Sequence, residues 1–164
     1  MNAVEDRLRE LGLALPPPKA PVANYVGTKQ SEDLLFVSGR VSQRRGEVAT
    51  DLSVEEAVTA ARDAMLDLLA IIKHHIGNLD LIVSIEQLRG FVRSSPSFTE
   101  QPRVIDGASD LLVALYGDAG RHARTATGAA QLPFGAAVQL DMVVRLRSGE
   151  TTARSVTDQQ RSQR

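Results

Sequence analysis

One arginine stands alone in a stretch of small and apolar residues. Arg124 is followed by TATGAAQLPFGAAVQLDMVV, residues 125–144, and the nearby sequence offers no obvious partner for its charge. A guanidinium stays charged and is costly to bury without a partner. Arg124 therefore pairs either with a carboxylate from elsewhere in the chain or with an acidic ligand, which its planar fork can hold through two hydrogen bonds.

Other residues that carry chemistry are sparse. The chain has no cysteine, which excludes disulfides, thiol nucleophiles and thiolate metal sites. His74 and His75 are neighbours on a predicted helix, so they point about 100° apart and cannot chelate one metal. His122 lies two residues before Arg124, where a ligand role and a structural role both remain open. We expect no metal and no cofactor.

Composition narrows the class of protein. The 164 residues carry a formal net charge of −1, and only four Phe and two Tyr are present. The chain therefore lacks the strong positive field and the aromatic stacking residues that favour binding of nucleic acid. The charged N-terminus, MNAVEDRLRELG, does not resemble a secretory signal, and no apolar run is long enough to span a membrane. We expect a cytoplasmic protein without a membrane segment.

The clearest predicted element is a helix over residues 53–76. Ser53 and Glu56 have the spacing of a capping box, and apolar residues then recur at helical spacing up to Gly77. Two shorter helices are predicted over residues 3–11 and 107–116. The first of these is too short to be stable alone and must dock on the rest of the chain.

Strands are predicted over residues 24–30, 34–42, 78–92 and 136–147, with a local irregularity near Gly90. In the last strand, Val138 and the residues at every second position after it are apolar, so this face packs into the core. The order of elements predicts an α+β fold with a mixed sheet and two helices on one face. The other face is half polar and must meet solvent or another subunit.

We expect one domain over residues 1–147, in which residues 1–21 form an N-terminal helix and a proline-rich connector. Residues 148–164 are polar and lack periodicity, and the sequence predicts a disordered tail there.

Several segments resemble the RidA/YjgF family of small proteins with a chorismate-mutase-like fold. They are ANYV at 23–26, FVSGRV at 36–41, GNLDLIVSIEQLRGFV at 77–92 and HARTATGAAQLPFGAAVQLDMV at 122–143. The spacing of eight residues from Arg124 to Leu132 of the Leu-Pro pair is the most specific part. The N-terminal LGLALPPP and the Gly-x-His-Ala-Arg motif at 120–124 are typical of one subgroup.

The resemblance implies a homotrimer that deaminates reactive 2-imino and enamine acids, such as 2-aminoacrylate, at a cleft between subunits. It implies that Arg124 holds the carboxylate of a small metabolite. It also implies that the other substrate-binding residues are Tyr25, Ser38, Gly39, Thr125 and Ala126.

One position departs from the family pattern. Active members commonly carry Glu on the last strand where this chain has Gln139, which we expect to take the catalytic place beside Arg124. An amide oxygen can orient a water molecule but cannot accept its proton at neutral pH. The alternative is therefore a protein of the same fold that binds a small carboxylate metabolite without turning it over.

Overall fold

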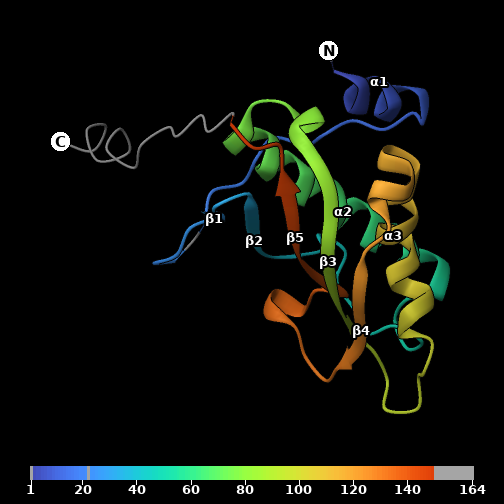
Figure 1. Ribbon diagram of the computed structural model, residues 1–164. Coiled ribbons are helices and arrows are strands. Elements are labelled where there is room, and N and C mark those ends of the chain that lie inside the picture. The colour runs from blue at the N-terminus through green and yellow to red at the C-terminus, as the bar shows by residue number, and fades with distance from the viewer. Residues whose placement is uncertain (1, 22, 150–164) are drawn as a thin grey trace.

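The computed structural model describes residues 2–21 and 23–149. A five-stranded sheet with the order β1-β2-β5-β3-β4 carries helices on one face (Figure 1). The β3–β4 pair is parallel and the other pairs are antiparallel, so the predicted α+β fold with a mixed sheet is confirmed. The elements are α1 (Ala3–Glu10), β1 (Thr28–Ser31), β2 (Leu34–Val41), α2 (Val54–Ile76), η1 (Leu79–Leu81), β3 (Ile82–Arg93), α3 (Gln101–Tyr116), η2 (Gly117–Gly120), β4 (Ala123–Ala129), η3 (Pro133–Gly135) and β5 (Val138–Leu146).

Helix α2 forms as the sequence predicts. The Ser53 hydroxyl accepts a hydrogen bond from the Glu56 backbone N–H at 3.1 Å, and the Glu56 carboxylate accepts one from the Ser53 backbone N–H at 2.9 Å. The second of these hydrogen bonds lowers the pKa of Glu56. The helix ends at Gly77, whose φ of +84° is readily reached only by glycine. Its apolar stripe then lies in the core against β2 and β5.

Helix α1 docks on the body of the protein, as its short length requires. Val4 and Leu8 are buried, and the Asp80 carboxylate accepts hydrogen bonds from the backbone N–H groups of Ala3 and Val4 at 2.8 and 2.9 Å. A carboxylate at this position satisfies two of the helix's free N–H donors and complements its dipole. The long-range contact replaces the local side-chain cap that α1 lacks.

Helix α3 is longer than predicted. It begins at Gln101 rather than at 107, with Pro102 in its first turn, where proline is well tolerated. Gly107 therefore lies inside the helix. A Cβ at this position would sit 2.1 Å from the Val58 carbonyl oxygen, so glycine is required for the close approach of α3 to α2.

The prediction of an irregular strand near Gly90 is wrong. The β3–β5 register shifts lie earlier, between Ile82 and Ser84 and between Ile85 and Gln87. A Cβ on Gly90 would lie 2.5 Å from a methyl carbon of Ile105. Gly90 thus marks the place where α3 packs closely on β3, and the strand itself continues without a break.

Strand β4 is absent from the predicted order of elements. Its residues other than Arg124 are small and mostly exposed, so the strand shows no alternation of apolar and polar side chains. The strand forms because its backbone pairs with β3, from Gln87–Ala123 to Arg93–Ala129. It lies at the edge of the sheet, with no strand on its far side. Strand β1 is also shorter than predicted and begins at Thr28 rather than at 24.

The last strand alternates as expected, with Val138, Leu140, Met142 and Val144 buried. The opposite face of the sheet carries exposed or half-buried side chains, including Phe36, which is 45% exposed and pairs with Val143. No helix within the described residues is long and apolar enough to cross a membrane. All but the first two residues of the predicted tail lie outside the described residues.

Candidate functional site

Arg124 lies on the edge strand β4 and reaches helix α3. Its Nη1 donates to the Asp106 carboxylate at 2.7 Å and to the Ser109 hydroxyl at 3.1 Å. The Arg124 side chain is 25% exposed and that of Asp106 is 50% exposed. The carboxylate partner that the neighbouring sequence does not reveal therefore comes from α3, 18 residues earlier.

A chain of hydrogen bonds continues from Arg124 to His122. The Nδ1 of His122 lies 2.6 Å from the Gly120 carbonyl oxygen, and its Nε2 lies 3.0 Å from the Ser109 hydroxyl. A carbonyl oxygen only accepts, so Nδ1 carries the proton and Nε2 of the neutral ring accepts from Ser109. The Ser109 hydroxyl thus donates to His122 and accepts from Arg124, which orders both side chains.

One edge of the Arg124 guanidinium remains available. Within residues 2–21 and 23–149, Arg124 makes its side-chain hydrogen bonds through Nη1 alone. The Nε and Nη2 donors point along the other edge, which is the pair that binds a carboxylate through two parallel hydrogen bonds. Asp106 therefore anchors the side chain and also offsets part of its charge.

The sheet register places Arg124 and Gln139 on opposite faces. Arg124 pairs with Leu88 of β3, whose buried side chain faces the helices. Gln139 pairs with Phe91 of β3, which lies on the other face. Because side chains alternate along a strand, Ala126 shares the face of Arg124, whereas Thr125 points the opposite way.

The remaining predicted site residues gather around β2. The Tyr25 hydroxyl accepts a hydrogen bond from Arg40 at 3.3 Å, and the Ser38 hydroxyl donates to the Val26 carbonyl at 2.6 Å. A Cβ on Gly39 would lie 3.3 Å from the Gln139 amide nitrogen, so the Gln139 side chain packs directly over this glycine. Tyr25 is 43% exposed.

The predicted site is thus divided into two groups within one chain. Strands β5 and β3 lie between β2 and β4, which is a separation of about 14 Å at the usual strand spacing. Arg124 belongs to the β4 group, and Tyr25, Ser38, Gly39 and Gln139 belong to the β2 group. A single chain does not bring Arg124 and Gln139 onto one ligand.

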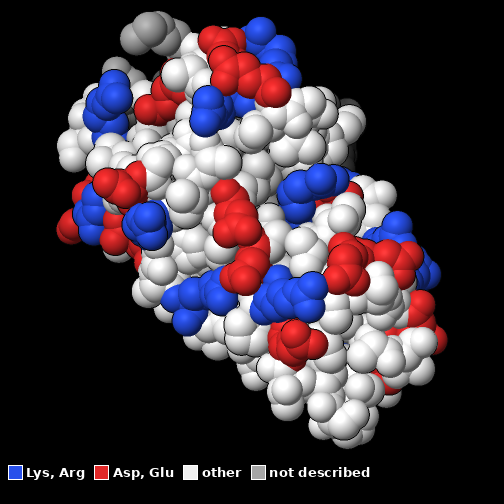
Figure 2. All heavy atoms as spheres, turned by 90° about the vertical axis from the view of Figure 1, so that its right-hand side faces the viewer, with Lys and Arg blue, Asp and Glu red and all other residues white. Residues whose placement is uncertain are grey.

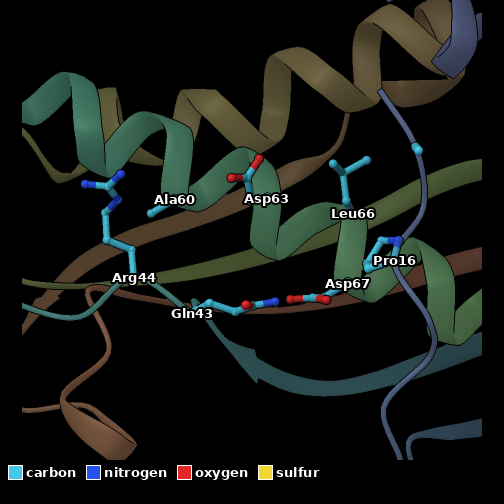
Figure 3. Close-up of a pocket in the computed structure, with 8 residues that line it drawn as sticks. Pro16, Gln43, Arg44, Ala60, Asp63, Leu66 and Asp67 are labelled. Carbon is cyan, nitrogen blue, oxygen red and sulfur yellow. The ribbon is translucent and has the colours of Figure 1, made fainter. Parts of the chain in front are cut away.

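Charges of both signs are interspersed near the β4 group. Figure 2 shows the side of the molecule with α3 and β4, where Lys and Arg alternate with Asp and Glu. The described residues contain no group of three or more His, Cys, Asp or Glu side chains that could hold a metal ion. A pocket between α2 and residues 14–16 is lined by none of the predicted site residues (Figure 3).

Sequence reasoning missed Asp106 and Ser109. They lie three residues apart on α3, and no motif connects them with Arg124. The one available signal is the spacing itself, since residues three apart on a helix share a face. The spacing indicates partners of Arg124 only when β4 is known to lie beside α3.

Comparison with known proteins places the fold in a family. The model described as "YjgF/chorismate_mutase-like, putative endoribonuclease" matches residues 5–145. The chain belongs to the YjgF/chorismate-mutase-like family.

Similar proteins cover most of the chain. Protein TCP17 of Trypanosoma cruzi is 43% identical over 150 residues, which are 87% of this chain and 94% of that protein. The structure of Atu1372 from Agrobacterium tumefaciens, a protein described as of unknown function, has a TM-score of 0.83 at 41% identity and covers 88% of this chain and 93% of its own.

Two further solved structures are similar to this chain. A protein from Shewanella oneidensis MR-1, named "putative endoribonuclease", has a TM-score of 0.85 at 32% identity over 88% of this chain and 100% of its own. The YjgF gene product of E. coli has a TM-score of 0.57 at 18% identity over 80% and 94%, which shows a shared fold.

Proposed function

We propose that this protein hydrolyses reactive 2-imino and enamine acids, such as 2-aminoacrylate, to 2-keto acids and ammonia. The observation that carries the proposal is the open Nε–Nη2 edge of Arg124 on an exposed edge strand. Such a fork binds the carboxylate that every substrate of this class contains. No metal or cofactor is needed, because the carbon of an iminium group is already electrophilic.

The division of the site supports a cleft between subunits. If β4 of one copy meets the β2 region of another, the open edge of Arg124 faces Tyr25, Ser38, Gly39 and Gln139 of that copy. The apolar side chains on the helix-free face of the sheet, such as Phe36 and Val143, favour self-association. A homotrimer provides three such clefts by rotational symmetry.

In this arrangement Arg124 fixes the substrate by its carboxylate. An enamine such as 2-aminoacrylate first becomes the imine by transfer of a proton from nitrogen to its terminal carbon. A water molecule held by the Gln139 amide oxygen then adds to the imine carbon and forms a carbinolamine, with one water proton passing to nitrogen. The proton of the carbinolamine hydroxyl then moves to the nitrogen and the carbon–nitrogen bond breaks, which releases ammonia and leaves the 2-keto acid. Positioning supplies most of the acceleration, since Gln139 cannot act as a base.

A second candidate is a binding protein for small carboxylate metabolites that lacks turnover. Gln139 favours it, because an amide takes the position where the family commonly carries a carboxylate. The Arg124–Asp106 pair is compatible with both candidates, since it orients the guanidinium whether or not a reaction follows.

The deciding experiment couples the protein to a dehydratase that generates 2-aminoacrylate from serine. We expect keto-acid formation to exceed the spontaneous rate, and Arg124→Ala to lose about 30- to 100-fold, the value of a charge-assisted bidentate contact. Arg121→Ala is the matched control, because Arg121 is 74% exposed and pairs only with its neighbour Asp118. Equal rates for the parent and Arg124→Ala would contradict the proposal.

Calorimetry on the same sample with 2-oxobutyrate separates the two candidates. Binding that needs Arg124, together with turnover, supports the enzyme, whereas binding without turnover supports the second candidate. RNA cleavage, which the description of the family includes, is not favoured by the mixed charges of Figure 2. Ribonuclease activity that persists in Arg124→Ala would come from another site or a contaminant.

A further inference from the structure

Asp67 is the only buried residue with a charged side chain among those that the structure describes. It lies on α2, on the side where the proline-rich connector crosses the helix. Its side chain is 8% exposed, whereas the next most buried acidic group in an ion pair, Asp141, is 16% exposed. A carboxylate taken this far out of water needs strong compensation from charge and hydrogen bonds.

The protein supplies little of that compensation. Within the described residues, the Asp67 carboxylate makes one ion pair, with the Lys19 ammonium at 3.6 Å, and accepts no hydrogen bond. That distance is well beyond the usual length of about 2.8 Å for a charge-assisted hydrogen bond. The Lys19 side chain is itself 51% exposed, so it is weakly held. The acceptor capacity of Asp67 is therefore largely unused.

A pocket of about 280 Å³ opens on this carboxylate. Gln43 and Asp67 point toward one another across it (Figure 3). Asp63, one helical turn before Asp67, adds a second carboxylate to the lining, although it pairs with Arg62 at 2.9 Å. Arg44 also lines the pocket, and its charge is offset by Glu56 at 2.9 Å. The apolar part of the wall consists of Ala14, Pro16, Ala60 and Leu66.

We propose that this pocket binds a small organic cation, a primary ammonium or guanidinium group on a short apolar stem. The N–H donors of the cation satisfy the Asp67 carboxylate, and the stem lies against the Ala and Pro side chains. A metal ion fits less well, because the described residues offer no cluster of three metal-binding side chains. Lys19 is the built-in occupant that such a ligand displaces.

The pocket is distinct from the proposed deaminase site, since its lining contains no residue of the β2 or β4 groups. The pocket lies between the proline-rich connector and α2, so a bound ligand contacts both. Binding therefore changes the surroundings of residues 14–19, which gives a signal at a defined place in the chain.

The test is titration of the ¹⁵N-labelled full chain with n-butylammonium chloride at constant ionic strength, followed by NMR. We expect saturable shifts of the Ala14, Ala60 and Asp67 amides. Choline chloride is the matched probe, because it carries the same charge without N–H donors. Linear shifts that are equal for both salts would overturn the proposal.

Two variants sharpen the result. Asp67→Asn keeps the size of the side chain and removes the charge, and we expect it to weaken butylammonium binding about tenfold or more. Lys19→Met removes the competing ammonium and should tighten binding several-fold.

Asp118→Asn, at a carboxylate that is 99% exposed, has the same change of net charge as Asp67→Asn and should bind like the parent. If Asp67→Asn is too unstable to study, Lys19→Met still decides. Affinity no tighter than that of the parent would refute the displacement of Lys19, and with it the site.

Discussion

Arg124 on β4 and Asp106 on α3 form an ion pair of 2.7 Å that ties the edge of the sheet to the helix layer. The pair uses one guanidinium nitrogen and leaves the bidentate edge open. Asp106 thus has two opposed effects on a carboxylate ligand, since it orients the clamp and repels the ligand's negative charge. Replacement of the Asp106 carboxylate by an amide separates these effects.

Asp106→Asn keeps an oxygen that accepts from Nη1 and removes the negative charge. We expect carboxylate ligands such as 2-oxobutyrate to bind roughly threefold more tightly, because a partly exposed charge pair is worth up to about 1 kcal/mol. Isothermal titration calorimetry measures the change. Asp110→Asn, an exposed neighbour on the same helix, is the control for net charge. Weaker binding in Asp106→Asn would show that orientation outweighs repulsion.

Gly107→Ala should destabilise the protein by roughly 3 kcal/mol, as overpacking against a rigid neighbour does. The added methyl would lie 2.1 Å from the Val58 backbone oxygen, so α2 and α3 must move apart. Gly128→Ala is the matched control, because its nearest neighbour is the flexible end of Gln101 at 3.0 Å. Urea unfolding of both variants tests the difference, and equal losses would contradict the packing argument.

Asp80→Ala should detach α1. The variant removes the acceptor for the N–H groups of Ala3 and Val4, a loss of about 1 kcal/mol for a cap. An eight-residue helix is not stable on its own, so it depends on such contacts with the rest of the protein. Hydrogen exchange should show faster exchange over residues 3–10 and unchanged protection in α2. Unaltered protection of α1 would mean that the buried side chains of Val4 and Leu8 suffice to hold it.

His75 should make stability depend on pH. Burial, with a smaller contribution from the charge of His74, lowers the pKa of His75 from its usual value of 6.5. The unfolded chain therefore binds the proton more readily, and stability falls as the pH drops below about 6.5 toward the lower folded pKa. Thermal unfolding of His75→Gln should vary less over this range. His74→Gln, at an exposed position, should keep most of the dependence, because burial is the larger cause of the lowered pKa of His75.

The resemblance and the elements with strong local patterns are predictable from sequence. The capping box at Ser53 and the regular apolar spacing after it predict α2 because the cap and the stripe are properties of neighbouring residues. The alternation after Val138 predicts β5 and its buried face for the same reason. Each of these two predictions needs only the pattern within one segment and the burial of one of its faces.

Strand β4 and the contacts of Arg124 are decided by tertiary structure. Ala, Gly and Thr around Arg124 have no preferred face, so the strand forms only because β3 offers backbone partners. Asp106 and Ser109 meet Arg124 because α3 packs beside that strand, held close to the neighbouring strand β3 where Gly90 leaves room for Ile105. The sequence by itself determined the family, α2 and β5, and it supplied the list of predicted site residues. Only the tertiary structure separated that site into two groups, because pairing and alternation place residues by strand position rather than by distance along the chain.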